Sequence, residues 1–264
     1  MLGAIIGDIV GSTREFNNIR NEDFELLPSG SRFTDDTVMT LAVAKWLIND
    51  SKHTPQGLVK EMLHLGNLYP DCGYGGLFRH WLNTKKPQPY GSYGNGSAMR
   101  VSPVGLYAGS LDEALSLAEI TASVSHNHPE GIKGAQSVAA CVYMSKRGEK
   151  RIDIKKYVEE SFGYKLDQNL ESIRHSYRFD SSCQGSVPQA IMAYLQRNNA
   201  ESALRLAISI GGDSDTIGCI TCAIANAYAP EAVSKSLSEQ CESLLTSELR
   251  QIMHDFENLL ARCH

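Results

Sequence analysis

Signals that start and stop helices recur along almost the whole of this 264-residue chain, and they limit its fold more than any other feature. Thr54 followed by Pro55 places proline at the first helical position after a capping residue. Ser110 and Glu113 have the spacing of a capping box. From these signals and the apolar periodicity, helices are predicted over about residues 39–46, 55–69, 110–125, 129–148, 153–162, 186–197, 200–210, 215–228, 231–244 and 247–262.

Segments in which apolar and polar residues alternate are nearly absent, and no repeat of solenoid length occurs. A chain of this length is close to the upper limit for one hydrophobic core, so a single domain over residues 1–264 is expected. Two glycine-rich stretches, residues 73–76 and 91–96, interrupt the helical pattern and are expected to be functional loops. The sequence therefore predicts an all-α protein, a compact single-domain orthogonal helical bundle.

The charge balance argues against nucleic-acid and membrane partners. The formal net charge is −5, and the one basic run, Lys146 to Lys156, has no interleaved aromatics and is expected to be a solvated inter-helix loop. The apolar N-terminus is interrupted by Asp8 and has no preceding basic region, so a signal peptide is not expected. No apolar run reaches the length of a membrane span. A cytoplasmic protein is therefore predicted.

The cysteines are expected to be free thiols. Their number is 7, which is odd, and they are scattered through a chain too large to need disulfide bonds. Cys219 and Cys222 form a CxxC pair, but no second pair is available to complete a zinc site. Both are expected to be buried as small apolar residues.

Two acidic clusters carry the chemistry of the sequence. Asp35 and Asp36 lie between threonines just before a helical segment. Capping of that helix needs only one polar side chain, so it does not account for the second carboxylate. Asp213, Asp215 and Thr216 repeat this layout after Gly-Gly, again at the start of a helix. Carboxylate and hydroxyl oxygens without imidazole or thiolate are typical ligands of Mg²⁺ or Mn²⁺. If the clusters meet, four carboxylates need about two divalent ions for charge balance.

Other interpretations of the acids stay open. A structural Ca²⁺ site fits poorly, because calcium sites favour one compact loop of alternating oxygen ligands. A third acidic position lies in GDIVGSTREF, where Asp8 belongs to a helical or turn segment and Glu15 follows. Taken alone, Glu15 is typical of a solvated surface residue.

Five motifs, in this order, resemble those of the ADP-ribosylglycohydrolases. They are GAIIGDIVGSTREF, FTDDTVMT, GNGSAMRVSPVGLY, SHNHPEGIKGAQ and GGDSDTIG, and the resemblance extends from residue 3 to about residue 230. It implies an all-α fold with two Mg²⁺ or Mn²⁺ ions at the base of a metal-lined cleft. The metal ligands that it implies are Thr34, Asp35, Asp36, Asp213, Asp215 and Thr216.

The resemblance also implies the remaining site residues. Glu15 is expected close to the scissile ribose, and Glu15 or Asp36 is expected to accept a proton from the attacking water. The segment Gly94–Arg100, called the glycine loop below, is expected to wrap the diphosphate. Arg100 is expected either to contact phosphate or to pair with an acid beneath this loop. His126 is favoured over His128 as a ligand-facing histidine. The other residues expected to bind the ADP-ribose are Gly94, Asn95, Gly96, Ser97 and Met99.

The function that the resemblance implies is a metal-dependent hydrolase. It would cleave the N-glycosidic bond between ADP-ribose and a modified arginine and release ADP-ribose. Hydrolysis of O-linked (serine) ADP-ribose, hydrolysis of a small ADP-ribose conjugate, and non-catalytic binding of ADP-ribose are the alternatives. The expected partner is an ADP-ribosylated protein or small conjugate, and a monomer is expected.

Overall fold

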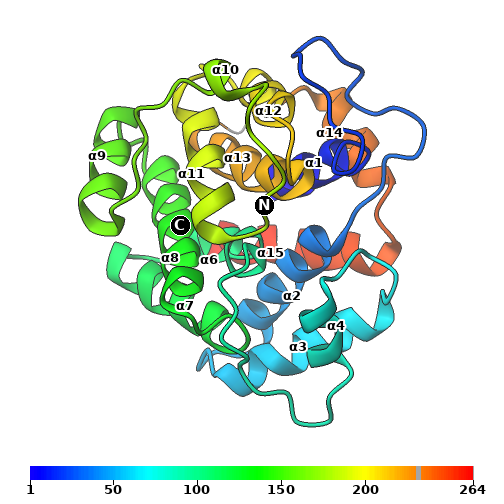
Figure 1. The fold of residues 1–264 in the computed structure, drawn as a ribbon. Coiled ribbons are helices and arrows are strands. Elements are labelled where there is room, and N and C mark those ends of the chain that lie inside the picture. The colour runs from blue at the N-terminus through cyan, green and yellow to red at the C-terminus, as the bar shows by residue number, and fades with distance from the viewer. Residues whose placement is uncertain (230–232, 264) are drawn as a thin grey trace.

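Helices are the only regular elements of the computed structural model, which describes residues 1–229 and 233–263 (Figure 1). The described residues contain no β-strand, only one isolated bridge between Gly94 and Ser182. The predicted all-α fold is therefore confirmed. The helices are α1 Leu2–Gly11, α2 Asp35–Asn49, α3 Pro55–Leu68, α4 Gly76–Leu82, α5 Gly96–Met99, α6 Ser102–Tyr107, α7 Leu111–Ser123, α8 Pro129–Lys146, α9 Arg151–Phe162, α10 Leu170–Ile173, α11 Cys183–Leu195, α12 Ala200–Ser209, α13 Ser214–Tyr228, α14 Lys235–Ser243 and α15 Ser247–Cys263.

The predicted caps form where the sequence places them. The Thr54 hydroxyl accepts a hydrogen bond from Gly57 N over 3.1 Å, and the Ser110 hydroxyl accepts one from Glu113 N over 3.1 Å. Two helices start earlier than predicted: α2 begins at Asp35 because Thr34 caps it, and α11 begins at Cys183 because Ser182 caps it. In the predicted helix over 231–244, residues 231 and 232 lie outside the described residues, and α14 begins at Lys235.

The basic run is not the single loop that was predicted. Lys146 is the last residue of α8 and Arg151 is the first residue of α9, so only residues 147–150 connect these helices. The run continues into α9, where Ile154 and Val158, four residues apart, are buried on one face of the helix. In the part of the chain that is described, no helix is long and apolar enough to cross a membrane. The cytoplasmic location stays a prediction.

Helix α1 packs against α13 with backbone nearly touching backbone, and the two lie side by side near the centre of Figure 1. Glycines at positions 3, 7 and 11 recur every four residues and therefore share one face of α1. A Cβ atom added at Gly7 would lie 2.1 Å from the carbonyl oxygen of Gly218. The pair of helices can approach this closely only because both contribute glycine at the contact.

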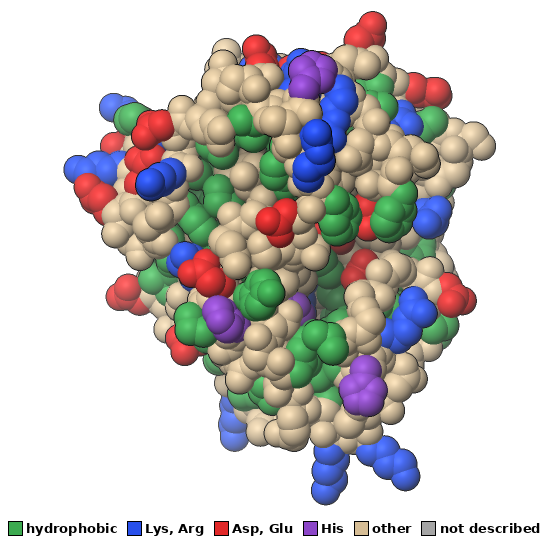
Figure 2. Space-filling model, in the orientation of Figure 1, with side chains coloured by type: hydrophobic (Ala, Val, Ile, Leu, Met, Phe, Trp, Pro, Cys, Tyr) green, Lys and Arg blue, Asp and Glu red, His purple; other side chains and the backbone are tan. Residues whose placement is uncertain are grey.

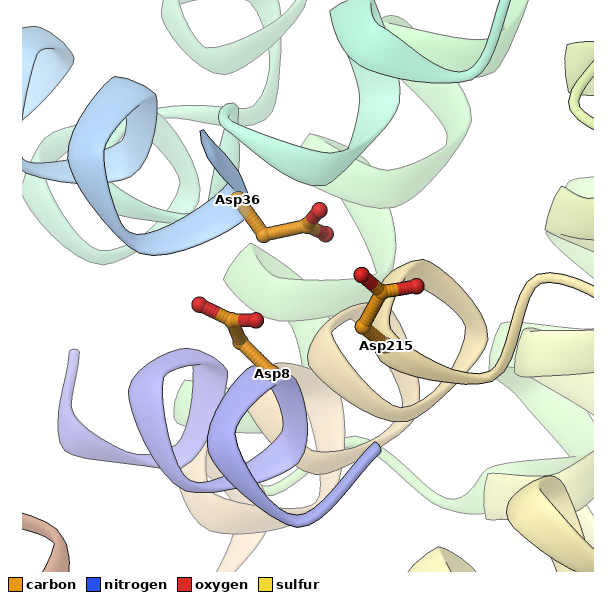
Figure 3. Close-up of side chains that lie close together, drawn as sticks. All are labelled: Asp8, Asp36 and Asp215. Carbon is orange, nitrogen blue, oxygen red and sulfur yellow. The ribbon is translucent and has the colours of Figure 1, made fainter. Parts of the chain in front are cut away.

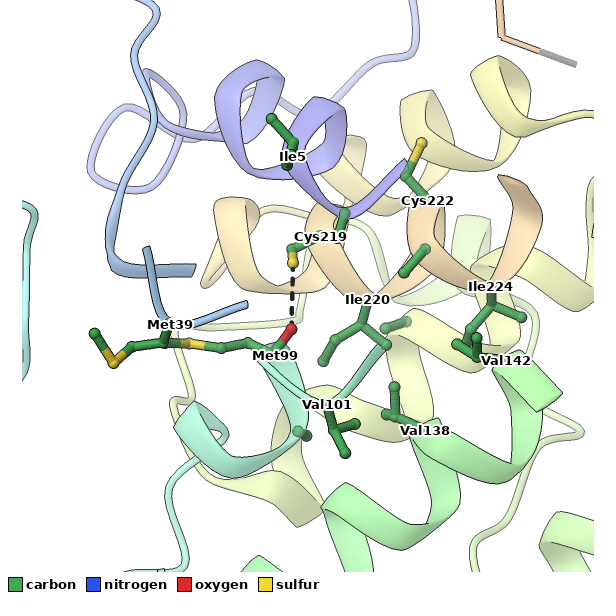
Figure 4. Close-up of a cluster of buried hydrophobic side chains, with 14 of the residues drawn as sticks. Ile5, Met39, Met99, Val101, Val138, Val142, Cys219, Ile220, Cys222 and Ile224 are labelled. Atoms are coloured by element: carbon green, nitrogen blue, oxygen red, sulfur yellow. Dashed lines mark hydrogen bonds between the residues drawn. The ribbon is translucent and has the colours of Figure 1, made fainter. Parts of the chain in front are cut away.

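The core surrounds α13, which is buried along most of its length (Figure 4). Ile220 and Ile224 of α13 face Val138 and Val142 of α8 in this cluster. Cys219 and Cys222 are both fully buried, and the thiols of the described cysteines up to Cys241 are free, as predicted. This core fixes α13 in position, and the N-terminal end of α13 leads directly to the acidic residues described next.

Candidate active site

The two acidic clusters lie together at the N-terminal ends of α2 and α13. The Thr216 hydroxyl donates a hydrogen bond to Asp36 Oδ2 over 3.2 Å. Thr34 caps α2, and Asp213 is the residue before the first turn of α13. Gly211 and Gly212 have φ values of +70° and +80°, which lets the chain turn tightly before Asp213, as the Gly-Gly pair predicted. The positive ends of two helix dipoles therefore face the carboxylates.

Asp8 completes the acidic cluster from a third direction. Its carboxylate points towards those of Asp36 and Asp215 (Figure 3), and one oxygen from each of the three lies within 4.8 Å of the others. Asp8 accepts hydrogen bonds from the backbone N and the hydroxyl of both Thr34 and Thr37. Asp8 thus joins α1 to the first turn of α2. The sequence alone did not assign a role to Asp8. The signal that could have identified it is its position among the glycines of α1.

Glu15 lies with the second cluster. Carboxylate oxygens of Glu15, Asp213 and Asp215 lie within 4.8 Å of one another. The loop that carries Glu15 is held by Asn18, whose side chain accepts from Gly212 N over 2.9 Å and donates to Gly212 O over 3.1 Å. The Gly211–Gly212 turn therefore positions Glu15 as well as Asp213.

Burial and mutual repulsion raise the pKa values of these acids. Burial, followed by the charge of Asp215, raises the pKa of Glu15 to about 7. Burial raises the pKa of Asp213 to about 6, against the hydrogen bonds that it accepts. The pKa values of Asp35, Asp36 and Asp215 lie well above the usual range, first because of burial and then because of neighbouring carboxylates. Such a group of acids is poised to ionise when a cation arrives.

One oxygen of the cluster has no partner. Asp36 Oδ1 is buried and has no hydrogen bond from any described residue. A buried carboxylate oxygen without a donor is costly, and a bound cation would remove this cost. The donor set is all oxygen, which fits a hard divalent ion such as Mg²⁺ or Mn²⁺. The residues present therefore fit a divalent cation, although the grouped acids include Asp8 and Glu15 and not the predicted ligand Asp35.

The acids lie at the bottom of a cleft of about 430 Å³, and Figure 2 shows a hollow on this face bordered by hydrophobic and acidic side chains. All but one of the predicted site residues line this cleft. They are Glu15, Thr34, Asp35, Asp36, Gly94, Asn95, Gly96, Met99, His126, Asp213, Asp215 and Thr216.

Ser97 is the exception, and Asn95 has a structural contact that was not predicted. The Ser97 hydroxyl donates to Gly131 O over 2.8 Å, behind the glycine loop and away from the cleft lining. Asn95 Nδ2 donates to Asp213 Oδ2 over 2.7 Å. The glycine loop is therefore tied directly to the acidic cluster.

His126 packs against the glycine loop, whereas Arg100 has partners that were not predicted. A Cβ added at Gly96 would lie 3.0 Å from His126 Nε2, so the loop follows the histidine ring closely. Arg100 is only 1% exposed, and among the described residues it has no carboxylate partner. Its guanidinium donates to Thr121 O over 2.6 Å and to the Ser125 hydroxyl over 2.8 Å. The predicted pairing of Arg100 with an acid is therefore wrong: the residues beneath the loop offer a carbonyl and a hydroxyl.

Apolar residues that the sequence analysis did not select form the rim of the cleft. Phe16 and Phe179 line it with 82% and 50% of their surfaces exposed. Their rings stack with centroids 6.5 Å apart and planes at 17°. Phe16 follows Glu15 directly, so this pair borders the acidic end of the cleft. Only the fold could reveal the pair, because its members come from distant loops.

Comparisons with known proteins concern the family and the fold of this chain. The family model described as "ADP-ribosylglycohydrolase" matches residues 1–264. "ADP-ribosylhydrolase ARH3" of Mus musculus is 27% identical over 96% of this chain and 90% of that protein. "ADP-ribosylarginine hydrolase Tri1" of Pseudomonas putida is 23% identical over 94% of this chain and 76% of that protein. A solved "ADP-ribosylglycohydrolase-related protein complex" has a TM-score of 0.72 and 22% identity, and the match covers 98% of this chain and 97% of that chain. This last likeness concerns the fold.

Proposed function

Because this chain belongs to the ADP-ribosylglycohydrolase family, we propose that it cleaves the N-glycosidic bond between ADP-ribose and a modified arginine, releasing ADP-ribose. The observation that supports this proposal most strongly is the acidic cluster at the bottom of a cleft. Two exposed, stacked aromatic rings lie at the mouth of the same cleft. The cluster supports hydrolysis of a glycosidic bond. The rings support an acceptor that is planar and cationic.

Two divalent ions, Mg²⁺ or Mn²⁺, are part of the proposal. Thr34, Asp35 and Asp36 would hold them from α2, and Asp213, Asp215 and Thr216 would hold them from α13. The partnerless Asp36 Oδ1 and the raised pKa values of the acids support this assignment. When bound, such ions orient ribose hydroxyls and lower the pKa of a coordinated water.

The residues of this chain then perform the proton transfer. The bond from C1 of the ribose to the guanidino nitrogen breaks, and the nitrogen leaves with the electron pair, which builds positive charge on the ring. The oxygen of a water molecule then bonds to C1, and the water gives a proton to the base, from which the departing guanidine takes it up. Glu15 is the proposed base, because a pKa of about 7 leaves much of it ionised at neutral pH and able to take the proton. Asp36 is the second candidate base, through its free oxygen. Asp8 holds the first turn of α2 and so orients Asp36.

The glycine loop is proposed to bind the diphosphate and distal ribose. Gly94 and Gly96 border the cleft without side chains, which allows a phosphate to approach the backbone closely. His126 faces the same loop. Ser97 is assigned to holding the loop from behind through Gly131.

The arginine acceptor is proposed from the aromatic rim. A guanidinium group stacks on aromatic faces, and such contacts contribute about 0.5–1 kcal/mol at exposed sites. A serine acceptor has no planar or cationic group that would use this pair of rings. The Pseudomonas putida relative, named as an arginine hydrolase, supports the same choice.

The test compares release of ADP-ribose from arginine-linked and serine-linked substrates, each with Mg²⁺ or Mn²⁺ and with a chelator. We expect metal-dependent release that is at least about tenfold faster from arginine. Faster release from serine, or from a small O-linked conjugate, would replace the acceptor assignment and keep the hydrolase. Tight binding of ADP-ribose without turnover of either substrate would replace the hydrolase by a binding protein.

A further inference from the structure

A chain of three buried residues connects the interior of the protein to the histidine beside the glycine loop. Arg100, at the end of α5, donates from its guanidinium to the Ser125 hydroxyl over 2.8 Å. Ser125 Oγ lies 2.8 Å from His126 Nδ1. Ser125 is fully buried, and Arg100 and His126 are 1% and 5% exposed. Water therefore has little access to this chain of hydrogen bonds.

The positions of the protons follow from counting donors. A guanidinium can only donate, so Ser125 Oγ must accept from Arg100. The single hydroxyl proton of Ser125 is then free to donate, and His126 Nδ1 is the remaining partner that the described residues give this oxygen. If Nδ1 carried a proton instead, the buried hydroxyl proton would have no acceptor, at a cost of about 1–3 kcal/mol. Nδ1 therefore accepts, and the neutral ring carries its proton on Nε2.

The Nε2 edge of His126 lies at the cleft. A Cβ added at Gly94 would lie 3.6 Å from Nε2, and one added at Gly96 would lie 3.0 Å from it. The ring is held on its sides by Phe78 and Tyr90, with centroid distances of 6.4 Å and 5.6 Å. No described residue forms a hydrogen bond with Nε2. Its proton is thus available to a ligand in the cleft.

We propose that Arg100 and Ser125 are positioning residues, which fix His126 as the neutral tautomer protonated on Nε2 and so make it a permanent hydrogen-bond donor to an anionic oxygen of the ligand. The proposal rests on the proposed function in one respect, that this oxygen belongs to the diphosphate of ADP-ribose. Burial and the charge of Arg100 lower the pKa of His126 well below its usual range, which keeps the ring neutral. The cation of Arg100 would also favour an anion in the cleft above it.

The tautomer is tested by ¹⁵N–¹H NMR of histidine-labelled protein without ligand, in which His126→Gln identifies the signals of His126. We expect Nδ1 to have the shift of an unprotonated nitrogen and Nε2 that of a protonated one. In Ser125→Ala we expect a mixture of the two tautomers, because Nδ1 loses its donor. Ser125→Thr keeps the hydroxyl and should restore the wild-type spectrum. Ser209→Ala is the matched control, since this buried hydroxyl bonds only to Leu206 O in its own helix.

Binding and kinetics test the consequence of the tautomer. For Ser125→Ala we expect the Kd for ADP-ribose and the KM to rise about tenfold, with kcat within about twofold of wild type. A His126 ring protonated on Nδ1 in the wild type would overturn the proposal. So would an unchanged Nε2–H tautomer together with an unchanged Kd in Ser125→Ala. If the protein released no ADP-ribose from any substrate, the proposed function would fail while the NMR result still decided the tautomer.

Discussion

The hydroxyl of Thr216 donates a hydrogen bond to Asp36 Oδ2, although the two residues are 180 positions apart in the sequence. This bond links the first turns of α2 and α13, which present their carboxylates to one volume. Asp8 of α1 holds the same turn of α2 through Thr34 and Thr37. Helices α1, α2 and α13 thus hold the site in place. A substitution of one site side chain is therefore not expected to expose the hydrophobic core.

Asp213→Asn should abolish hydrolysis and leave the protein folded. The amide keeps the shape of the side chain, and Asn95 can still donate to its oxygen, but the negative charge needed by a cation is lost. We expect a fall in kcat/KM of at least about 10³-fold, which corresponds to about 4 kcal/mol. The measurement is release of ADP-ribose with saturating Mn²⁺, alongside circular dichroism. Asp255→Asn, at an exposed position of α15, is the control and should retain full activity.

Glu15→Gln should lower turnover strongly while metal binding persists. Glu15 is assigned as the base, so its amide cannot accept the proton of the attacking water. We expect kcat to fall about 10²–10³-fold with a metal Kd within about threefold of wild type. Isothermal titration with Mn²⁺ separates the two effects. A metal Kd weakened as much as kcat would make Glu15 a ligand instead of a base.

The metal-free protein should become less stable as the pH rises from about 4 to about 7. The pKa of Asp213 rises from 3.8 to about 6 on folding, and that of Glu15 rises from 4.5 to about 7. Between these values the folded protein binds more protons at these two groups than the unfolded chain, so their contribution to stability is largest at low pH and is lost as they ionise. Thermal unfolding at pH 5 and pH 7.5 should show a Tm lower by about 5 °C at the higher pH.

Added Mn²⁺ should reverse this trend, because it binds the ionised carboxylates and stabilises the folded state most at pH 7.5. In Asp213→Asn the dependence of Tm on pH should be weaker, since one of the groups with a raised pKa is removed. A wild-type Tm that rises steadily from pH 5 to pH 7.5 without metal would contradict the buried, repelling acids.

Gly7→Ala should destabilise the protein, although alanine normally favours a helix. The added Cβ would lie 2.1 Å from the backbone oxygen of Gly218, so α1 would have to move away from α13. We expect a loss of about 3 kcal/mol or more in the free energy of unfolding, measured by urea titration. Gly76→Ala is the matched control in α4, where nothing lies within 4 Å of the added atom. Its effect should stay within about 1 kcal/mol.

Phe179→Ala should weaken the use of arginine-linked substrates in particular. Removal of one of the two stacked rings takes away a surface for the guanidinium, and we expect KM to rise about fivefold with kcat nearly unchanged. Hydrolysis of a small conjugate without a guanidinium should be unaffected. Ile152→Ala, at another exposed apolar position, should change neither substrate. Equal loss for both substrates would assign Phe179 to the ADP-ribose instead of the acceptor.

Local signals in the sequence predicted much of the fold, because caps and periodicity act within one or two turns. Thr54 and Ser110 cap the helices that their spacing predicted. For α1 the sequence predicts only a helical or turn segment, since its residues, apart from Asp8, are apolar or glycine and give no amphipathic pattern. Its glycines are explained only by their contact with α13, where Gly3 meets Cys222, Gly7 meets Gly218 and Gly11 meets Asp215, and this contact joins segments that are far apart in the sequence.

The candidate site was predictable where residue types alone determine the chemistry. The paired aspartates at 35–36 and at 213 and 215 point to a hard cation wherever they meet, and the fold brings them together. The role of Arg100 could not be derived in this way, because its partners depend on which backbone carbonyl and hydroxyl lie beneath it. The exposed Phe16 and Phe179 form a pair only through the packing of two distant loops.

The close contact of α1 with α13 has a consequence for protein synthesis. Helix α1 leaves the ribosome long before the surface that receives it, because α13 begins only at Ser214. Until then the α1 glycines and Asp8 lack their neighbour, and premature termination before residue 213 would leave a polypeptide without Asp213 and Asp215. Hydrolytic competence should therefore arise only once α13 has been translated, and products truncated before it should be inert.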